Sequence, residues 1–389
     1  MKDNKVVRAQ QSAMRLRRQF LQSDAGLFDG VLGDQEMTAV MNEWVEPYRE
    51  RIYPPLETLR LFIGQVLSTD RACQDVVGRR LSDPQSREQK PGVGFPLARI
   101  GALISLASGA VLRYPVAACE GKGMGEQSLL ANLLDHLTAN DVVLADALLS
   151  TGWVIEGARR RGVDVVMAQQ GRRITDFTRG QRLGKHDHVV HGPRPPKPQT
   201  MSTEDDARYP AFIVMREIKV KGRILVTTRC DSQCVSTRAL DALYKMRWNI
   251  EVDFRTIKST LQMDVLRCKS QPMIEKEIAV CLLAYNLVRW TMAKAASLLD
   301  VLPRALSFTG VKRLLNAFAD QLRRTPSDQI NTLIATVLVS IATLKLPHRP
   351  GRIEPRTKRR RPKNLPLLTV PRQVARELIR TQRELNRVT

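Results

Sequence analysis

The stretch Tyr244–Lys258, YKMRWNIEVDFRTIK, decides how the rest of the chain is interpreted. It contains neither Pro nor Gly, and it follows Ser236 and Thr237, two residue types that cap helices. We therefore predict a helix from about Ser236 to about Thr260. At helical spacing, four polar side chains then share one face: Tyr244, Arg247, Glu251 and Lys258.

These four residues, called the tetrad below, allow two interpretations. In the first, they are a solvated helix face stabilised by ion pairs. In the second, Glu251 is a metal ligand, and the phenol and the two cations hold phosphates, as a two-metal site for phosphoryl transfer requires. Residue types and spacing alone leave both interpretations open.

The charge of the chain predicts a polyanionic partner. Its 389 residues suffice for two or three domains, and 43% hydrophobic with 26% charged residues is typical of a globular protein. A formal net charge of +23 repels itself unless a polyanion compensates it, so nucleic acid is the first expected partner and acidic lipid the second. Because the sequence lacks both a long apolar run and the apolar core of a secretory signal, we predict a cytoplasmic protein without a membrane span.

Cysteine and histidine residues give no sign of a metal site. The six cysteines are scattered, which predicts free thiols in a reducing compartment. Cys230 and Cys234 are separated by three residues rather than the usual two, and no second pair follows at zinc-finger spacing. His186, His188 and His191 do not share one strand face, so we expect these histidines to be exposed.

Upstream of the tetrad, the sequence predicts a helix and then strands. Apolar residues recur at helical spacing over Leu56–Leu67, after two prolines that suit a helix start. From about Val93 the pattern is that of a hairpin, with a turn at Ser108–Gly109 and a returning strand over Val111–Ala118. A Leu-rich helix follows, beginning near Leu129.

Asp146 ends a short apolar run, Asp141–Asp146, that is typical of a buried strand. Sheets of α/β proteins present catalytic carboxylates at the carboxyl ends of such strands. Asp146 would equally serve as the N-cap of a helix beginning near Ser150. The residues alone do not choose between these two roles.

The remaining elements are predicted from periodicity and turn residues. Before the tetrad they are a helix over Thr151–Arg161, a strand over Val163–Ala168, a basic segment over 172–185, and a hairpin over 212–228 that turns at Lys221–Gly222. After the tetrad they are a long buried helix over Ile274–Ala296 and a basic run, Lys358–Lys363, that we interpret as a DNA clamp.

The tetrad resembles the signature of the insertion-sequence transposases of family four, which are DDE enzymes with a YREK motif. The order is Tyr, two residues, Arg, three residues, Glu, six residues, Lys, and all four letters and all three gaps match. Two flanking runs, Met263–Lys269 and Leu282–Leu287, also resemble this family, and Leu61–Cys73 resembles part of its N-terminal domain loosely.

This resemblance implies an α/β fold with a ribonuclease-H-like core, in which helices flank a mixed sheet. It also implies a division into an N-terminal helical DNA-binding region, 1–84, a catalytic domain, 85–300, and a C-terminal helical and basic region, 301–389. A β-rich insertion would occupy about 170–235, and its basic residues would follow the DNA backbone.

The resemblance also implies roles for single residues. Asp146 corresponds to the second catalytic aspartate, and with Glu251 it would bind Mg²⁺ or Mn²⁺. Arg247 and Lys258 would grip phosphates, and Tyr244 would hydrogen-bond a phosphate near the scissile bond. The expected partners are double-stranded DNA, at inverted-repeat ends and at the target, and a second copy of the chain at the bacterial nucleoid.

Two neighbouring positions depart from a simple reading of the family pattern. Ala147 and Leu148 follow Asp146, where the family usually has an Arg and an aromatic residue.

Trp248, inside the tetrad stretch, is expected in the core, with base stacking as the alternative.

The first of the family's three carboxylates has no counterpart. The segment Gln85–Pro96, which the family carries downstream of that aspartate, follows here almost directly on the helical N-terminus. We interpret this as an internal deletion of the first strand with its aspartate, for which Asp83, between Ser and Pro, is a weak substitute. The prediction is a transposase by descent whose activity is in doubt, and the alternative is a non-enzymatic remnant that occupies transposon ends.

Overall fold

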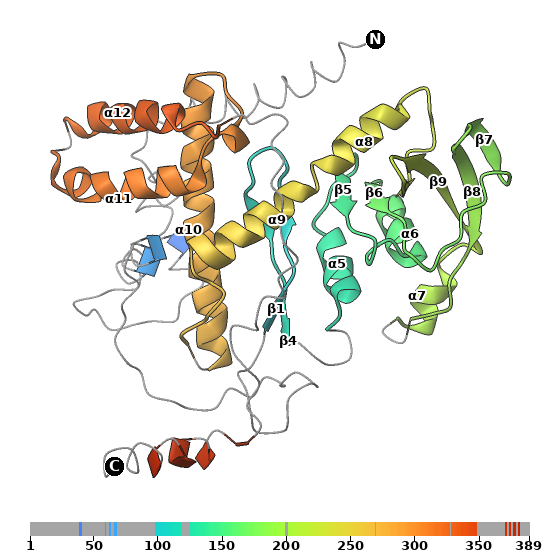
Figure 1. Cartoon of the computed structure of the whole chain (residues 1–389), viewed down its shortest axis with the longest axis horizontal. Helices are drawn as coiled ribbons and strands as arrows, with labels where there is room; N and C mark the ends of the chain where they lie inside the picture. Colours follow the sequence, from blue (N-terminus) through green and yellow to red (C-terminus); the bar gives the residue numbers. More distant parts are fainter. Residues whose placement is uncertain are drawn as a thin grey trace. The chain divides into compact units, whose positions relative to one another are not determined.

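The structure of the chain is a computed structural model (Figure 1). It describes residues 39–40, 59, 62–63, 66–67, 98–118, 124–198, 201–268, 270–326, 328–347 and most of 370–381. Asp83, Gln85–Pro96 and Lys358–Lys363 lie outside the described residues. The described chain forms two compact units, which we call the sheet unit (98–103 and 112–249) and the helical unit (104–111 and 250–347).

The sheet unit is built on a six-stranded mixed sheet with the strand order β5-β6-β10-β9-β8-β7. Strands β5 and β6 are parallel, and the other neighbouring pairs are antiparallel. The strands span β5 Val142–Ala145, β6 Asp164–Ala168, β7 Gln181–Gly184, β8 Asp187–Pro193, β9 Phe212–Val220 and β10 Arg223–Thr227. The predicted α/β class with a mixed sheet and helices is confirmed, and so are the predicted strands β5, β6, β9 and β10.

The first two strands of the sheet and the helix between them form a β-α-β motif. Helix α6, Gly152–Arg160, connects β5 to β6, as a pair of parallel strands requires. The helix begins where the Thr151 side chain accepts a hydrogen bond from the Val154 N–H. Helix α5, Glu126–Leu134, precedes β5 and packs against α6.

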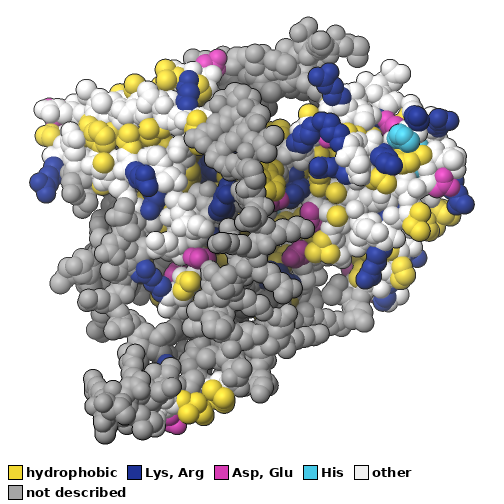
Figure 2. Space-filling model, in the orientation of Figure 1, with side chains coloured by type: hydrophobic (Ala, Val, Ile, Leu, Met, Phe, Trp, Pro, Cys, Tyr) yellow, Lys and Arg dark blue, Asp and Glu magenta, His cyan; other side chains and the backbone are white. Residues whose placement is uncertain are grey.

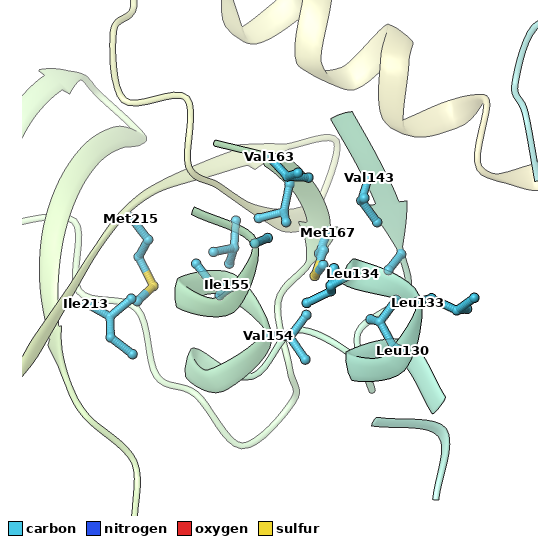
Figure 3. Close-up of a cluster of buried hydrophobic side chains, with 14 residues drawn as sticks. Leu130, Leu133, Leu134, Val143, Val154, Ile155, Val163, Met167, Ile213 and Met215 are labelled. Carbon is cyan, nitrogen blue, oxygen red and sulfur yellow. The ribbon is translucent and has the colours of Figure 1, made fainter. Parts of the chain in front are cut away.

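Both faces of β6 are buried, which explains its continuous apolar sequence. Val165 and Met167 point into a cluster formed with α5, α6 and β9, in which Ile155 and Ile213 are also inaccessible to solvent (Figure 3). Val166 points to the opposite face and is equally buried. This core fixes the carboxyl end of β5, where Asp146 follows.

The turn between β9 and β10 has the geometry that its sequence predicts. Lys221 and Gly222 have φ angles of 48° and 80°, and two consecutive positive φ angles define the type I′ turn that suits a two-residue hairpin. The strands pair without a shift from Arg223 opposite Val220 onward. Lys221 and Gly222 are therefore held in one conformation at the end of the sheet.

A long hairpin precedes the sheet, in agreement with the prediction. It consists of β1 Ala98–Ile100, β2 Leu103–Ile104, β3 Val111–Arg113 and β4 Val116–Ala118, with β1 paired to β4 and β2 paired to β3. Its tip, 104–111, belongs to the helical unit. The sheet unit also contains two further helices, α7 Thr203–Ala207 and α8 Thr237–Lys245, and α8 packs against β6 and β9.

The helical unit is organised around α10, Gln271–Leu298, which confirms the predicted long buried helix. The other elements are the main part of α9 Trp248–Arg255, a π-helix Thr256–Thr260, the 3-10 helix Pro303–Ala305, α11 Phe308–Arg324 and α12 Ile330–Thr343. Both α11 and α12 pack on α10 (Figure 1). Of the predicted early helix, Leu59, Phe62, Ile63, Val66 and Leu67 are described, and all five are helical. Among the described residues, no helix is long and apolar enough to cross a bilayer.

The prediction of one continuous helix over 236–260 is wrong. Helix α8 ends at Lys245, and the N–H groups of Met246, Arg247 and Asn249 bond to carbonyls three residues back, which tightens the backbone into a turn. A π-helix over Thr256–Thr260 then replaces the last α-turn. Sequence periodicity assumed 3.6 residues per turn throughout, and it therefore detected neither the turn after Lys245 nor the π-helix.

Two predicted exposures are also wrong. His188 is buried, and its ring has a partner on each side: Nδ1 donates to the Arg179 carbonyl at 2.7 Å, and Nε2 lies 3.2 Å from the Glu217 carboxylate. His186 and His191 are exposed, as expected. Trp248 is 61% exposed, so it is not a core residue.

Candidate catalytic and phosphate-binding residues

Asp146 is exposed directly after the carboxyl end of β5. Its Oδ1 accepts hydrogen bonds from the N–H groups of Leu148, at 3.0 Å, and Leu149, at 3.3 Å. The carboxylate therefore caps the turn that follows the strand, whereas Thr151 caps α6. The alternative that Asp146 is the N-cap of α6 is wrong, and the turn instead holds the carboxylate at the sheet edge.

A buried ion pair fixes the start of α8, the helix that carries Tyr244. The Arg216 guanidinium on β9 is fully buried and donates to Asp187 on β8, with a distance of 2.7 Å from Nε to Oδ1. Nη1 of the same guanidinium donates to the Val235 carbonyl at 2.9 Å, and Asp187 accepts a bond from the Thr237 hydroxyl at 3.0 Å. The first turn of α8 is thus attached to the middle of the sheet.

Tyr244 and Arg247 lie together in the sheet unit. The Arg247 guanidinium carbon lies 5.9 Å from the centroid of the Tyr244 ring. Arg223, at the start of β10, lies 5.8 Å from the same centroid. Tyr244 itself is 5% exposed, so two cations approach one largely buried ring.

Glu251 is exposed on α9, and Asp253, two residues later, is completely buried. Residues two positions apart in a helix point to nearly opposite sides, so burial of Asp253 directs Glu251 away from the core of the helical unit. Asp253 accepts hydrogen bonds from Nη2 of Arg289 at 2.6 Å and from Nη2 of Arg304 at 2.9 Å. This network anchors α9 to α10 and to the 3-10 helix.

The same network reaches the hairpin tip. The Tyr285 hydroxyl accepts from Arg289 and donates to the Gly109 carbonyl, both at 2.9 Å, and burial raises the pKa of this hydroxyl. The Asn286 side chain bonds both the N–H and the carbonyl of Val111 at 2.8 Å. Tyr285 and Asn286 belong to Leu282–Leu287, one of the two flanking runs that resemble the transposase family. In the structure they anchor the hairpin.

Lys258 lies on the π-helix and is exposed. Ile257, its neighbour, is buried, and the Leu261 N–H bonds to the Thr256 carbonyl five residues back at 3.0 Å. Single-turn π-helices are frequent at functional sites. A second anchor follows, because the Glu277 carboxylate on α10 accepts from the N–H groups of Arg267 and Cys268 at 2.9 Å.

The structure brings some of the predicted site residues together within one unit. Tyr244 and Arg247 are neighbours in the sheet unit, which also contains Asp146, whereas Glu251 and Lys258 belong to the helical unit. Within the described part of the chain, no group of three or more His, Cys, Asp or Glu side chains is arranged to hold a metal ion.

Comparison with known proteins identifies the family of this chain. The family model described as "Transposase DDE domain" matches residues 70–287, more than half of the chain, and this range contains Asp146 and the whole tetrad. The chain belongs to the DDE transposase family.

Among curated proteins, the chain is similar to "Transposase InsG for insertion sequence element IS4" from Escherichia coli (strain K12). The two are 28% identical over 265 residues, which covers 64% of this chain and 56% of that protein. The chain therefore spans little more than half the length of this relative. No solved structure matches the chain.

Sequence reasoning missed the residues that position this DDE domain's tetrad. The pairs Asp187–Arg216 and Asp253–Arg289 are separated by 29 and 36 residues. No local spacing reveals such pairs. The sequence signal is a charged residue that follows or interrupts an apolar run, such as Arg216 after Phe212–Met215 in β9 or Arg289 in α10, since charges are buried only when paired.

Proposed function

We propose that this protein is a DNA transposase that catalyses metal-dependent strand cleavage and transfer at insertion-sequence ends. The observation that carries the proposal is the DDE family match, which spans both proposed carboxylate ligands and the tetrad. The similarity to a transposase of the IS4 element supports an IS4-type enzyme. The net charge of +23 suits a chain whose substrate is double-stranded DNA.

In this proposal Asp146 and Glu251 are the metal ligands. Both side chains are exposed carboxylates on ordered backbone, and carboxylate oxygens are the ligands that Mg²⁺ and Mn²⁺ prefer. When bound, the metal would lower the pKa of the attacking hydroxyl and stabilise the leaving oxygen. The turn at Asp146 and the anchor at Asp253 each hold one carboxylate-bearing segment in place within its own unit.

The phosphate contacts in this proposal come from Tyr244, Arg247 and Lys258. An Arg guanidinium holds a phosphate through two parallel N–H donors, whereas Lys contributes a point charge. The buried ring of Tyr244 beside Arg247 supports a fixed position for that guanidinium. Lys258, on the π-helix, would contact a separate phosphate of the same strand.

The finer organisation belongs to the same proposal. The segment 85–300 would be a ribonuclease-H-like catalytic domain, with the strands β7 to β10 inside the β-rich insertion at about 170–235. Residues 1–84 would bind DNA, and 301–389 would add a helical and basic region. Two copies on paired DNA ends, at the nucleoid, would complete the active assembly.

A second candidate is a remnant that occupies transposon ends without cutting them. The sequence offers no strand-borne first aspartate before Gln85–Pro96, and Asp83 is the nearest carboxylate. Within the described residues, β5 pairs with β6 alone, although β5 is buried and apolar, as a strand inside a sheet would be. An internal deletion of a strand next to β5 would account for both observations.

A nicking assay separates the two candidates. Labelled DNA carrying the inverted-repeat ends is incubated with the unmodified protein and with Glu251→Gln, in Mg²⁺ and then in Mn²⁺. Nicking by the unmodified protein alone supports the transposase and excludes the remnant. Binding of the ends by both proteins, with nicking by neither, supports the remnant, and failure of both to bind the ends contradicts both candidates.

A further inference from the structure

The loop between β6 and β7, residues 169–180, begins at the sheet edge where Asp146 stands. Strands β5 and β6 are parallel, with Ala145 paired to Met167, so both strands end at this edge. Asp146 directly follows β5, and Gln169 directly follows β6. The conformation of the loop therefore affects the immediate surroundings of the candidate carboxylate.

Alternate side chains attach the β6–β7 loop to the sheet. Arg173, Thr175 and Phe177 are partly buried, whereas Ile174 and Asp176 between them are exposed. Such alternation is typical of an extended segment that lies with one side against a surface. The loop thus lies along the sheet unit with one row of side chains turned inward.

Two titratable side chains are buried beneath the loop. His188 on β8 and Glu217 on β9 are paired across the two strands, and they are 1% and 4% exposed. The Thr175 hydroxyl donates to Oε2 of Glu217 at 2.7 Å, and the Phe177 ring lies 4.7 Å from the imidazole, centroid to centroid. The loop therefore contacts both members of the pair.

The hydrogen bonds of His188 require a hydrogen between the two side chains. Nδ1 lies 2.7 Å from the Arg179 carbonyl oxygen, which can only accept, so Nδ1 carries a hydrogen. Nε2 lies 3.2 Å from Oε2 of Glu217. With a neutral imidazole and an ionised carboxylate, two lone pairs would face each other in a buried site. A hydrogen on Nε2 or on Oε2 removes this repulsion.

The other charged groups around the pair do not supply this hydrogen. Arg173 lies 3.8 Å from Oε1, the other oxygen of the carboxylate. Asp176 acts on the imidazole through its charge, but its carboxylate is paired with Arg179 at 3.2 Å. Arg182, the neighbour of the imidazole on β7, is exposed. The hydrogen between Nε2 and Oε2 is therefore one that the pair itself binds.

We propose that the β6–β7 loop is a pH-sensitive device, closed on the sheet while His188 and Glu217 hold one proton between them and released when that proton passes to water. In the open loop both groups are solvated, and a solvated imidazole is neutral above about pH 6.5. The closed loop then binds one proton more than the open loop. By linkage, the open population should rise about tenfold per pH unit above roughly pH 6.5, until the closed pair also loses its proton. The inference uses neither DNA nor metal, so it does not depend on the proposed function.

The test is limited proteolysis of the full chain between pH 7 and pH 9. Trypsin cleaves after Arg172, Arg173 and Arg179 only when the loop leaves the sheet, so the initial rate tracks the open population. Mass spectrometry identifies these cuts among all others. Glu217→Gln is the reference, because an amide N–H donates to a neutral imidazole without an added proton. Dividing the rate of the unmodified protein by that of this variant cancels the pH dependence of trypsin itself.

The ratio of the two rates should rise about tenfold from pH 7 to pH 8. His186→Gln is the matched control, since His186 is exposed and its ring also contacts Phe177, at 5.5 Å between centroids. Figure 2 shows a histidine side chain at the surface of the sheet unit, near Lys and Arg side chains. The control should keep the pH dependence of the unmodified protein. A ratio that stays constant with pH, or a control that loses the dependence, overturns the inference.

NMR of the unmodified protein tests the proton directly and needs no variant to fold. Ring ¹⁵N signals of His188 report a hydrogen on Nε2, and the carboxyl ¹³C signal of Glu217 reports one on Oε2. A hydrogen on either atom at pH 7 supports the inference. Its absence from both atoms while the loop resists trypsin overturns the inference.

Discussion

Asp253 accepts a hydrogen bond of 2.6 Å from Arg289 although both residues are buried, with 0% and 5% of their surfaces exposed. Arg304 donates to the same carboxylate. Removing one partner of a buried charge pair leaves the other desolvated and unpaired. The Asp253 network therefore anchors α9, the helix that bears Glu251.

Replacing Asp253 by Ala should lower the free energy of unfolding by about 3–5 kcal/mol, because two arginines lose their counter-charge. Urea denaturation followed by circular dichroism measures this change. Asp264→Ala, at an exposed position in the same unit, is the matched control and should stay within roughly 0.5 kcal/mol of the unmodified protein. Equal effects of the two substitutions would contradict this role of Asp253.

Replacing Arg216 by Met should loosen the start of α8. Asp187 would stay in place without its partner, and the Val235 carbonyl would lose its donor. We expect a loss of about 3–5 kcal/mol and faster hydrogen exchange in the first turn of α8 than in α6. Hydrogen exchange with mass spectrometry measures both helices in one experiment, and uniform acceleration of both would argue against a local anchor.

Gly109→Ala should destabilise the helical unit, because the backbone conformation is strained for Ala and the added methyl group is too close to Arg289. The φ angle of Gly109 is +80°, and an added Cβ would lie 2.9 Å from the Arg289 guanidinium. We expect a loss of more than about 1 kcal/mol, since a left-handed conformation alone costs a non-Gly residue that much. Gly125→Ala, where the added atom meets open space, is the control, and a thermal melt that ranks the two variants equally would contradict the prediction.

The pair Asp241–Lys245 predicts a defined pH dependence. The hydrogen bond lowers the pKa of Asp241 and raises that of Lys245. The carboxylate stabilises the fold above its unfolded pKa, and this contribution is lost as the pH falls through its lowered folded pKa. Asp241→Asn should therefore be less stable than the unmodified protein at pH 7 and should match it in strong acid, measured by denaturation at each pH. If the two proteins still differ in stability at a pH below both the folded and the unfolded pKa of Asp241, the ion pair is not the origin of the difference.

Much of the fold was accessible from the sequence because it is encoded locally. The apolar runs of β5 and β6 and the Lys221–Gly222 turn are short-range signals, and the structure confirms each of them. The long helix α10 likewise follows from its uninterrupted apolar pattern. These elements need no knowledge of distant residues.

The errors arose where distant residues decide the outcome. His188 can be buried because the carboxylate of Glu217, 29 residues later in the chain, provides a hydrogen-bond partner. The break after Lys245 and the π-helix near Lys258 are departures from α-helical geometry that periodicity does not detect. The roles of Asp146 and Glu251 came from the family resemblance, and they stay predictions until tested.

The most direct test of the central claim is to locate the metal on the protein. Fe²⁺ replaces Mg²⁺ in the presence of end DNA, and added hydrogen peroxide with ascorbate generates hydroxyl radicals at the bound ion. The radicals cut the nearby backbone, so mass spectrometry of the fragments maps the ion. The account predicts cuts close to both Asp146 and Glu251, and the loss of both cuts in Glu251→Gln. Cuts that fall elsewhere, or that persist unchanged in this variant, would contradict the assignment of these two carboxylates as partners at one metal site.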